Sequence, residues 1–405
     1  MISLVVQRVL AVTVGEAGIA RIGQIRNLIQ IVTSTASLGT FNGIVKYVSE
    51  YKEDNKSLQG LFSTTFIFVF VGSIITSVVV FFSASWITKE LFGNLEFLNV
   101  IRLLALVPFV IGLNRLFMGV INGLSAYKKY AKIDLLGYVL SIVLLLVCLY
   151  YYDLKGCLFS IVITPIIQLA IIFYIFGSII KKHIKVKELA LKVPFAKEIL
   201  AFTLMSFIST GLLNYVELDI RTMITNKINI NEAGYWTAMG FISQNYMSFS
   251  SGLFTLYVVP KFARIYSGHA FKKEVLNIYK TILPLFGIGM LLVYIFRNWI
   301  IAIIYPNFTG MEPLFKWQLL GDFVRLATLV IAHQFWAKKM VTSFIVTELL
   351  SLALFYFLSK YLVLQYGAEG VVMAHFYRYI IYFGIVAMAV WYYFSNKKND
   401  EFKNE

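Results

Sequence analysis

The chain has 405 residues, of which 59% are hydrophobic and 14% are charged, and its mean hydropathy is +0.76. A soluble protein of this size is closer to half apolar, so the composition excludes an ordinary soluble enzyme or binding module and indicates a protein that crosses a membrane many times. The formal net charge of +15 could suggest nucleic acid. However, the basic residues lie mostly in the connections between apolar runs, which argues against a nucleic-acid partner.

Continuous apolar runs indicate the fold class. Leu61–Thr88, Gly156–Ile180 and Ala233–Pro260 contain no charged residue, and each exceeds the ~20 residues that cross a bilayer as a helix. Because a closed β-barrel would show alternation instead, the runs predict an all-α bundle. They predict about twelve transmembrane helices, at residues 1–15, 22–46, 60–85, 98–124, 132–152, 156–180, 198–224, 233–260, 276–296, 316–336, 340–360 and 368–395.

The first predicted helix is shorter than the others. Its residues reach roughly 22 Å, against a hydrocarbon core of ~30 Å. We therefore expect a truncated first helix and a missing N-terminal segment of roughly 15–20 residues. The opening stretch MISLVVQRVLAVTVG has Arg8 in its middle and no cleavage-type end, so it does not resemble a secretory signal peptide.

Lysine and arginine predict the orientation, because positive residues are enriched in cytoplasmic connections. The connections after even-numbered helices, with the C-terminal tail, carry 20 of them, whereas the connections after odd-numbered helices carry seven. Both termini are therefore expected in the cytoplasm.

The sequence also repeats itself. Glu16, in the segment GEAGIARIGQ, and Glu232, in NEAGYWTAMG, are 216 residues apart. Gly156 and Gly370 are 214 residues apart. Six helices in each copy give both copies the same orientation in the membrane.

This repeat predicts two pseudo-symmetric six-helix lobes, as in many transporters. The lobes would comprise residues 1–180 and 198–395, joined by a basic cytoplasmic linker at 181–197 and followed by a cytoplasmic tail at 396–405. A substrate site is expected where the two lobes face each other near the bilayer midplane.

Two of the predicted helices are more polar than the rest. In the helix at 22–46, ten charged, amide or Ser/Thr side chains lie between Arg26 and Lys46, and in its repeat partner at 233–260, seven lie between Ser243 and Thr255. A single serine or threonine in a membrane usually serves helix packing. This many on two repeat-related helices predicts the wall of a water-filled cavity.

Charged residues also fall inside the predicted spans. Each one facing lipid at the bilayer centre would cost ~2.5–3.5 kcal/mol, so twelve would cost roughly 30–40 kcal/mol, more than an ordinary fold can carry. Most must therefore face a polar interior or one another, unless they lie near helix ends. Twelve of the charged residues within these spans are Arg8, Arg26, Arg102, Arg115, Asp134, Glu217, Asp219, Arg221, Asp322, Arg325, Glu348 and Arg378.

Two pairs among these charges can form along one helix face. Glu217 and Arg221 are at i,i+4, and Asp322 and Arg325 are at i,i+3. For each pair, a structural salt bridge and a ligand contact remain open alternatives.

Arg26, Arg115 and Arg378 have no acid within helical reach. They would either find partners on other helices or bind an anionic ligand, since a guanidinium binds phosphate in a bidentate fork. His333 lies two turns after Arg325, and it is either a hydrogen-bonded interior residue or a proton carrier.

Four motifs carry a resemblance to a known family: FNGIVKYVSEY at 41–51, EAGYW at 232–236, YVVPKFARI at 257–265 and FTGMEPLFKWQLLGD at 308–322. With these motifs the chain resembles, over nearly its whole length, the Wzx-type flippases of the multidrug/oligosaccharidyl-lipid/polysaccharide exporter superfamily. The resemblance is to the common-antigen (lipid III) branch, and O-antigen members look similar.

The resemblance implies a multi-pass protein of the bacterial inner membrane that functions in surface polysaccharide (lipopolysaccharide) biosynthesis. It would move an undecaprenyl-diphosphate-linked oligosaccharide, an O-antigen or enterobacterial common antigen unit, from the cytoplasmic to the periplasmic leaflet by alternating access. Its partners would be this lipid-linked oligosaccharide and membrane lipids, with a glycan polymerase and a chain-length regulator as candidate protein partners.

The resemblance also implies that the first, second, seventh and eighth helices line the cavity. Together with the polarity argument, it predicts a cavity for diphosphate and sugars formed by Arg8, Arg26, Asn27, Gln30, Lys46, Arg115, Arg221, Gln244, Asn245 and Arg325. Candidates for coupling to protons or sodium are Asp219, Asp322 and His333. We expect no catalytic residue, no cofactor and no metal site.

Two alternatives remain from the sequence. A multidrug exporter of the same superfamily would move mainly organic cations and should favour acids in its cavity, whereas the embedded charges here number seven basic and five acidic. A membrane glycan polymerase should carry a large outward loop with catalytic groups. The longest outward connection here, 297–315, shows no acidic pair and no nucleophile motif.

Overall fold

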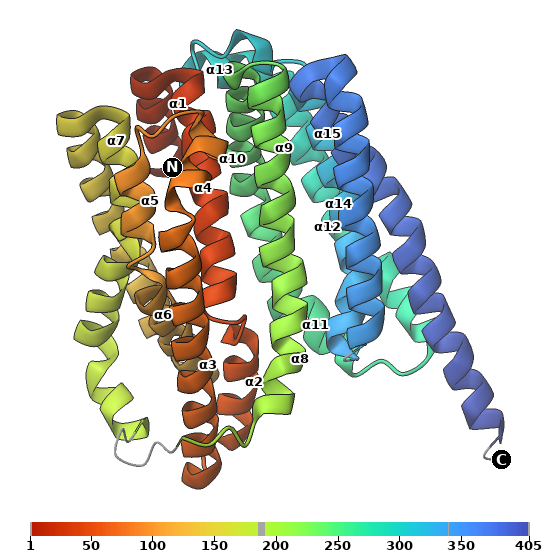
Figure 1. Ribbon diagram of the computed structural model, residues 1–405. Helices are drawn as coiled ribbons and strands as arrows, with labels where there is room; N and C mark the ends of the chain where they lie inside the picture. The colour runs from red at the N-terminus through yellow and green to blue at the C-terminus, as the bar shows by residue number, and fades with distance from the viewer. Residues whose placement is uncertain (1, 185–190, 339, 404–405) are drawn as a thin grey trace. The chain divides into compact units, whose positions relative to one another are not determined.

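The computed structural model describes residues 2–184, 191–338 and 340–403, and it contains helices and connections but no strand within these ranges (Figure 1). The predicted all-α fold is confirmed. The helices are α1 (Ile2–Ala36), α2 (Phe41–Tyr51), α3 (Asn55–Phe82), α4 (Ala84–Phe92), α5 (Leu98–Leu104), α6 (Pro108–Gly123), α7 (Tyr127–His183), α8 (Ala196–Ser206), α9 (Leu213–Lys227), α10 (Ile230–Leu253), α11 (Val259–Ala263), α12 (Gly268–Ile295), α13 (Arg297–Ile304), α14 (Leu314–Ala337) and α15 (Val341–Lys403). Short π-helical segments, η2 (Phe207–Leu212) and η3 (Phe254–Val258), and one 3₁₀ turn, η4 (Thr309–Met311), complete them.

Among the described residues, six helices are long and apolar enough to cross a membrane, or seven if α5 and α6, bent by 46°, are taken as one span. Two of the six are the long helices α7 and α15, and each contains two of the predicted spans. Each of the twelve predicted helices coincides with helical residues of the structure.

The long helices are broken where the backbone leaves the helical region. α7 breaks at Asp153, with φ of 49°, and α15 breaks at Gly367, with φ of 57°. Three residues later, a Cβ on Gly156 would lie 2.1 Å from the carbonyl oxygen of Cys148, and one on Gly370 would lie 2.4 Å from that of Leu362. Residues eight apart in a straight helix are separated by ~12 Å, so the chain folds back at both breaks.

These breaks support the sequence repeat. The two repeat-related glycines each follow a break by three residues, and each approaches the backbone of the residue eight positions earlier. Only glycine fits so close to another backbone. The helix after the second break is also capped, because the backbone N–H of Ala368 donates to Glu232 Oε2 at 3.0 Å.

Contacts along the chain define two compact units, and α1 and α9 each contribute to both. Unit 1 comprises Met1–Ala20 and Asp219–Glu405, and unit 2 comprises Arg21–Leu218. The division therefore falls inside helices rather than in the predicted linker at 181–197, of which residues 185–190 lie outside the described residues. The two lobes that the repeat predicts, with boundaries at 180 and 198, stay a prediction.

The core of unit 2 lies between α2, α3, α6 and α7. Glycines on α6 bring α2 close: a Cβ on Gly119 would lie 3.1 Å from Ile44, and one on Gly123 would lie 2.7 Å from Val48. α3 begins at a capped end, since Asp54 accepts hydrogen bonds from the backbone N–H groups of Lys56 and Ser57. Buried side chains that fill this core include Ile44, Val48, Leu61, Phe62, Leu116, Val120, Ile121, Ile172 and Phe176.

In unit 1, α14 packs extensively on both parts of α15, and α10 and α12 pack on α14. The opening part of α1 crosses α10 where a Cβ on Gly234 would lie 2.3 Å from the carbonyl oxygen of Glu16. The two repeat-related EAG motifs thus meet at this crossing. Gly321 has a similar role between α14 and α15, because a Cβ there would lie 2.4 Å from the ring of His375.

Candidate substrate and coupling site

A buried polar cluster around Asp322 is the most densely hydrogen-bonded site in unit 1 among the described side chains. Asp322, on α14, has no exposed surface. Its Oδ2 accepts hydrogen bonds from Ser243 and Tyr246 of α10 and from Gln318 Nε2 at 3.0 Å. Its Oδ1 accepts from His375 Nε2 of α15, also at 3.0 Å. A buried carboxylate is tolerable only with such donors.

Arg325 completes this cluster from the partly exposed side. Its Nη1 lies 3.9 Å from Asp322 Oδ1, and 35% of its side chain is exposed. The guanidinium also lies 5.8 Å from the centre of the Tyr379 ring. The i,i+3 pair of Asp322 and Arg325 therefore forms, and the arginine still has surface to offer an anion.

The cluster can hold a proton or a small cation, because it combines a carboxylate, an imidazole, two hydroxyls and an amide. It lacks the ligand set of a transition-metal site. Across the described residues, no group of three or more His, Cys, Asp or Glu side chains could hold a metal ion.

Arg221, on α9, is buried with polar and aromatic partners. Its Nε donates to Thr237 Oγ1 at 2.8 Å, and its guanidinium lies 4.6 Å from the centre of the Trp236 ring. Only 6% of the residue is exposed. Asp219, on the same helix, is half-buried.

The remaining unit 1 candidates lie apart from the Asp322 cluster. Arg8 is exposed and donates to the carbonyl oxygen of Ile303 in α13. His333 hydrogen-bonds to the carbonyl of Leu329 and lies against Phe254, with ring centres 4.8 Å apart. The histidine that joins Asp322 is thus His375 rather than His333.

Of the two polar candidates on α10, Gln244 is exposed. Asn245 is half-buried and donates to the carbonyl of Phe241 at 3.0 Å, within its own helix.

In unit 2, Asn27 joins a polar network with α9. Its Nδ2 donates to Asn214 Oδ1 at 2.8 Å and to Glu217 Oε2 at 3.0 Å. Arg26, next to it, is half-buried, and Gln30, one turn later, is exposed. These side chains follow one another along the second part of α1.

The other two unit 2 cations lie beside aromatic rings. Lys46 Nζ is 4.4 Å from the centre of the Tyr47 ring and 5.8 Å from that of Phe202. Arg115 lies 5.8 Å from the centre of the Phe41 ring and is half-buried. Such cation–π contacts hold a cation in place without neutralising it.

The candidate site residues are thus divided between the units. Arg26, Asn27, Gln30, Lys46 and Arg115 lie in unit 2, and Arg8, Asp219, Arg221, Gln244, Asn245, Asp322, Arg325 and His333 lie in unit 1. A common electropositive chamber formed by both sets stays a prediction.

Sequence reasoning missed His375, Tyr246 and Gln318. Gln318 precedes Asp322 by four residues and therefore shares its helix face, which was a usable signal. His375 and Tyr246 come from other helices, 53 and 76 residues away from Asp322. No sequence spacing indicates those contacts.

A second buried cluster provides a partner for Arg378. Its Nη2 lies 3.7 Å from Glu348 Oε1, and its Nε donates to Ser351 Oγ at 2.7 Å. Tyr382 donates to the other oxygen of Glu348 at 2.9 Å. Of the alternatives left open for Arg378, a partner on another helical segment is the one that forms.

Comparison with known proteins shows the family. The family described as polysaccharide biosynthesis protein matches residues 23–308, most of the chain. The chain belongs to this polysaccharide biosynthesis family. The lipid III flippases of Escherichia coli strain K12 and of Shigella flexneri are each 27% identical to it over 386 residues, covering 94% of this chain and 92% of theirs. The resemblance inferred from the sequence motifs is confirmed.

Solved structures share the fold of this polysaccharide biosynthesis protein. An inward-facing multidrug resistance MATE family transporter of the MOP superfamily matches with a TM-score of 0.78 and 12% identity, over 95% of this chain and 93% of its own. The lipid II flippase MurJ, in an inward closed conformation, matches with a TM-score of 0.73 and 15% identity, over 96% of this chain and 84% of its own. At these identities the likeness shows the fold of a polytopic transporter.

Proposed function

We propose that this member of the polysaccharide biosynthesis family moves a lipid-linked oligosaccharide from the cytoplasmic to the periplasmic leaflet of the bacterial inner membrane. The observation that carries the proposal is the likeness to the lipid III flippases, which extends over 94% of the chain. The transporter fold and the apolar spans support it. The substrate is an undecaprenyl-diphosphate-linked unit, either the common-antigen unit (lipid III) or an O-antigen unit.

The cations of the two units would hold the diphosphate. Arg26, Lys46 and Arg115 come from unit 2, and Arg221 and Arg325 come from unit 1. Arginine suits this role because its fork binds phosphate oxygens in pairs. In alternating access, such groups bind the head group on one side of the membrane and release it on the other, while the polyprenyl tail stays in lipid.

Ion coupling would act through the Asp322 cluster. In this cluster a buried carboxylate and an imidazole are in direct contact. When the pair takes up or releases a proton, its hydrogen bonds to the neighbouring helices change. Asp219 and His333 stay candidates for the same role. Both termini are placed in the cytoplasm by the positive-inside argument, and partnership with a polymerase or chain-length regulator stays a prediction.

The proposed activity is transport without bond formation, which separates it from a polymerase. In proteoliposomes containing only the purified protein, a lipid-linked oligosaccharide should change leaflet and remain chemically unaltered. A longer glycan in the product would indicate a polymerase instead. Export of organic cations with no movement of the oligosaccharide would indicate a multidrug exporter.

The arginines are tested in cells that depend on this protein for surface glycan. Arg26→Ala should lower surface glycan roughly tenfold or more, as loss of a charge-assisted phosphate contact predicts. Lys273→Ala, an exposed cation on α12, is the matched control and should leave glycan unchanged. Normal glycan from Arg26→Ala at normal protein level would remove Arg26 from the site.

A further inference from the structure

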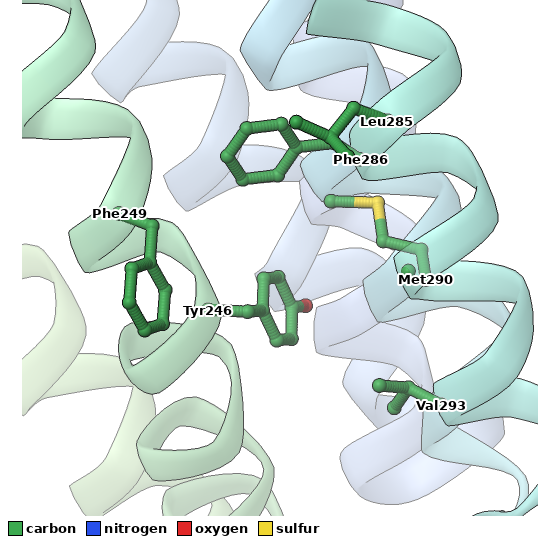
Figure 2. Close-up of a pocket in the computed structure, with 7 residues that line it drawn as sticks. Tyr246, Phe249, Leu285, Phe286, Met290 and Val293 are labelled. Atoms are coloured by element: carbon green, nitrogen blue, oxygen red, sulfur yellow. The ribbon is translucent and has the colours of Figure 1, made fainter.

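An apolar pocket of about 430 Å³ lies in unit 1 between α10 and α12. Figure 2 shows Tyr246 and Phe249 on one side and Leu285, Phe286, Met290 and Val293 on the other. Gly289 completes the lining. Pockets of this size hold small ligands or segments of larger ones.

The pocket opens onto a surface made for hydrocarbon. Phe249 is 75% exposed and Leu285 is 65% exposed. α12 is one of the helices apolar enough to span the membrane, and Ile288 and Leu292, beside the pocket, are exposed as well. An apolar pocket offers water few hydrogen-bond partners, so a hydrocarbon chain suits this pocket better than water does.

Tyr246 connects this pocket to the coupling cluster. Its ring forms part of the pocket wall, and its hydroxyl donates to Asp322. Any chain that enters the pocket therefore contacts a ring that is fixed at its other end to a buried carboxylate. Because packed interiors respond to added volume by shifting side chains, occupancy of the pocket can alter the hydrogen bonding of Asp322.

The lining favours an isoprenoid over a saturated acyl chain. Three of the seven lining residues are aromatic and one is methionine. An isoprenoid carries a double bond and a methyl branch in each unit, so it presents flat, polarisable surface to aromatic rings and to a thioether, which attract such groups. A saturated chain has neither feature and gains only general apolar burial.

We propose that the pocket between α10 and α12 binds the isoprenoid tail of the lipid-linked substrate, and that Tyr246 transmits its occupancy to Asp322. This inference rests on the proposed function. It assigns the tail a defined site on the protein, whereas the transport proposal alone requires only that the tail stay in lipid.

Filling the pocket is the first test. A Cβ at Gly289 meets no atom within 4 Å and its backbone is ordinary, so Gly289→Leu places a side chain in the pocket without strain. Excluding a few tail carbons should lower oligosaccharide transport in proteoliposomes roughly tenfold. Gly177→Leu on α7, which also meets no atom within 4 Å, is the matched control and should transport normally.

Photo-crosslinking identifies the occupant. Wild-type protein is illuminated in vesicles with a diazirine-bearing polyprenyl diphosphate or with a phospholipid that carries the diazirine in its acyl chain. The polyprenyl probe should label peptides of α10 and α12 at the pocket residues, and Gly289→Leu should abolish that labelling. Equal labelling by the phospholipid would show an ordinary bilayer site, and labelling elsewhere would place the tail outside the pocket; either outcome overturns the inference.

The two proposals fail differently. If wild-type protein moves no oligosaccharide, the proposed function itself is wrong. If wild-type protein moves it and Gly289→Leu does so equally well, only the tail site is wrong. Tyr246→Phe, which keeps the pocket wall but loses the bond to Asp322, should still be labelled by the probe while transporting poorly. Normal transport by Tyr246→Phe would refute the link to Asp322.

Discussion

Asp322 shows, at the scale of single residues, how a charge is kept inside a membrane protein. Its two oxygens accept hydrogen bonds from side chains on α10, α14 and α15. These hydrogen bonds replace the ones that water would make with the carboxylate. Each bond to a charged group contributes about 1.5–3 kcal/mol. Losing one partner leaves part of the charge unsatisfied, and this cost exceeds the contribution of the bond itself.

His375 should therefore be needed for stability as well as for transport. We expect His375→Leu to lower the free energy of unfolding by about 3–5 kcal/mol, because Asp322 loses a donor and gains no other. His375→Gln can still donate an N–H and should cost less. Thermal unfolding in detergent measures both, and equal stability of the leucine variant and wild type would contradict the assigned contact.

At the scale of elements, glycines set how closely helices approach. The crossing of α1 and α10 depends on Gly234, whose missing side chain accommodates the carbonyl of Glu16. Close approach through small residues is a common way to join helices in membranes, where burial of apolar surface drives little association.

Gly234→Ala should disrupt this crossing. The added methyl group meets backbone, which cannot rotate away, so we expect a loss of about 1–3 kcal/mol of stability. Gly240→Ala on the same helix meets no atom within 4 Å and should be neutral or slightly stabilising, because alanine favours helix. Thermal unfolding of the pair separates the crossing from helix propensity, and a neutral Gly234→Ala would show that the crossing tolerates a side chain.

The cap of α3 should respond to pH. The hydrogen bond from the Ser57 hydroxyl is the largest cause that lowers the pKa of Asp54 from its usual 3.8. Hydrogen bonds from the backbone N–H groups of Ser57 and Lys56 also lower it. Because the pKa of Asp54 is lower in the folded chain than in the unfolded chain, the carboxylate stabilises the fold at pH values above its unfolded-state pKa. This contribution disappears as the pH falls through the folded-state pKa.

Asp54→Asn should therefore differ from wild type by a constant small amount between about pH 5 and 8. The difference should shrink below about pH 4, where the carboxylate takes up its proton. Thermal midpoints across this range check it, and a difference that changes near neutral pH would assign the effect to another group.

At the scale of the whole molecule, the distribution of basic residues predicts the orientation of the chain in the membrane. In a variant without Cys148 and Cys157, a single cysteine at Lys129 should resist a membrane-impermeant maleimide in intact cells, whereas one at Asn94 should react. Both positions lie in or next to connections between spans. The opposite labelling pattern would invert the proposed orientation.

Hydropathy was enough to predict the all-helical fold, since a continuous apolar run can satisfy its backbone groups in lipid only as a helix. The Asp322–Arg325 pair also followed from spacing along one helix. His375 and Tyr246 could not, because their contacts with Asp322 depend on how three distant segments pack. The same holds for Arg221, whose contacts with Thr237 and Trp236 depend on how α9 meets α10.

The division of the chain between the two units limits where it can be cut into two separately expressed fragments. The first twenty residues belong to the same unit as residues 219–405, while residues 196–218 belong to the unit that begins at Arg21. Genes for residues 1–190 and 191–405 should therefore yield stable protein only when expressed together, as each product completes the other.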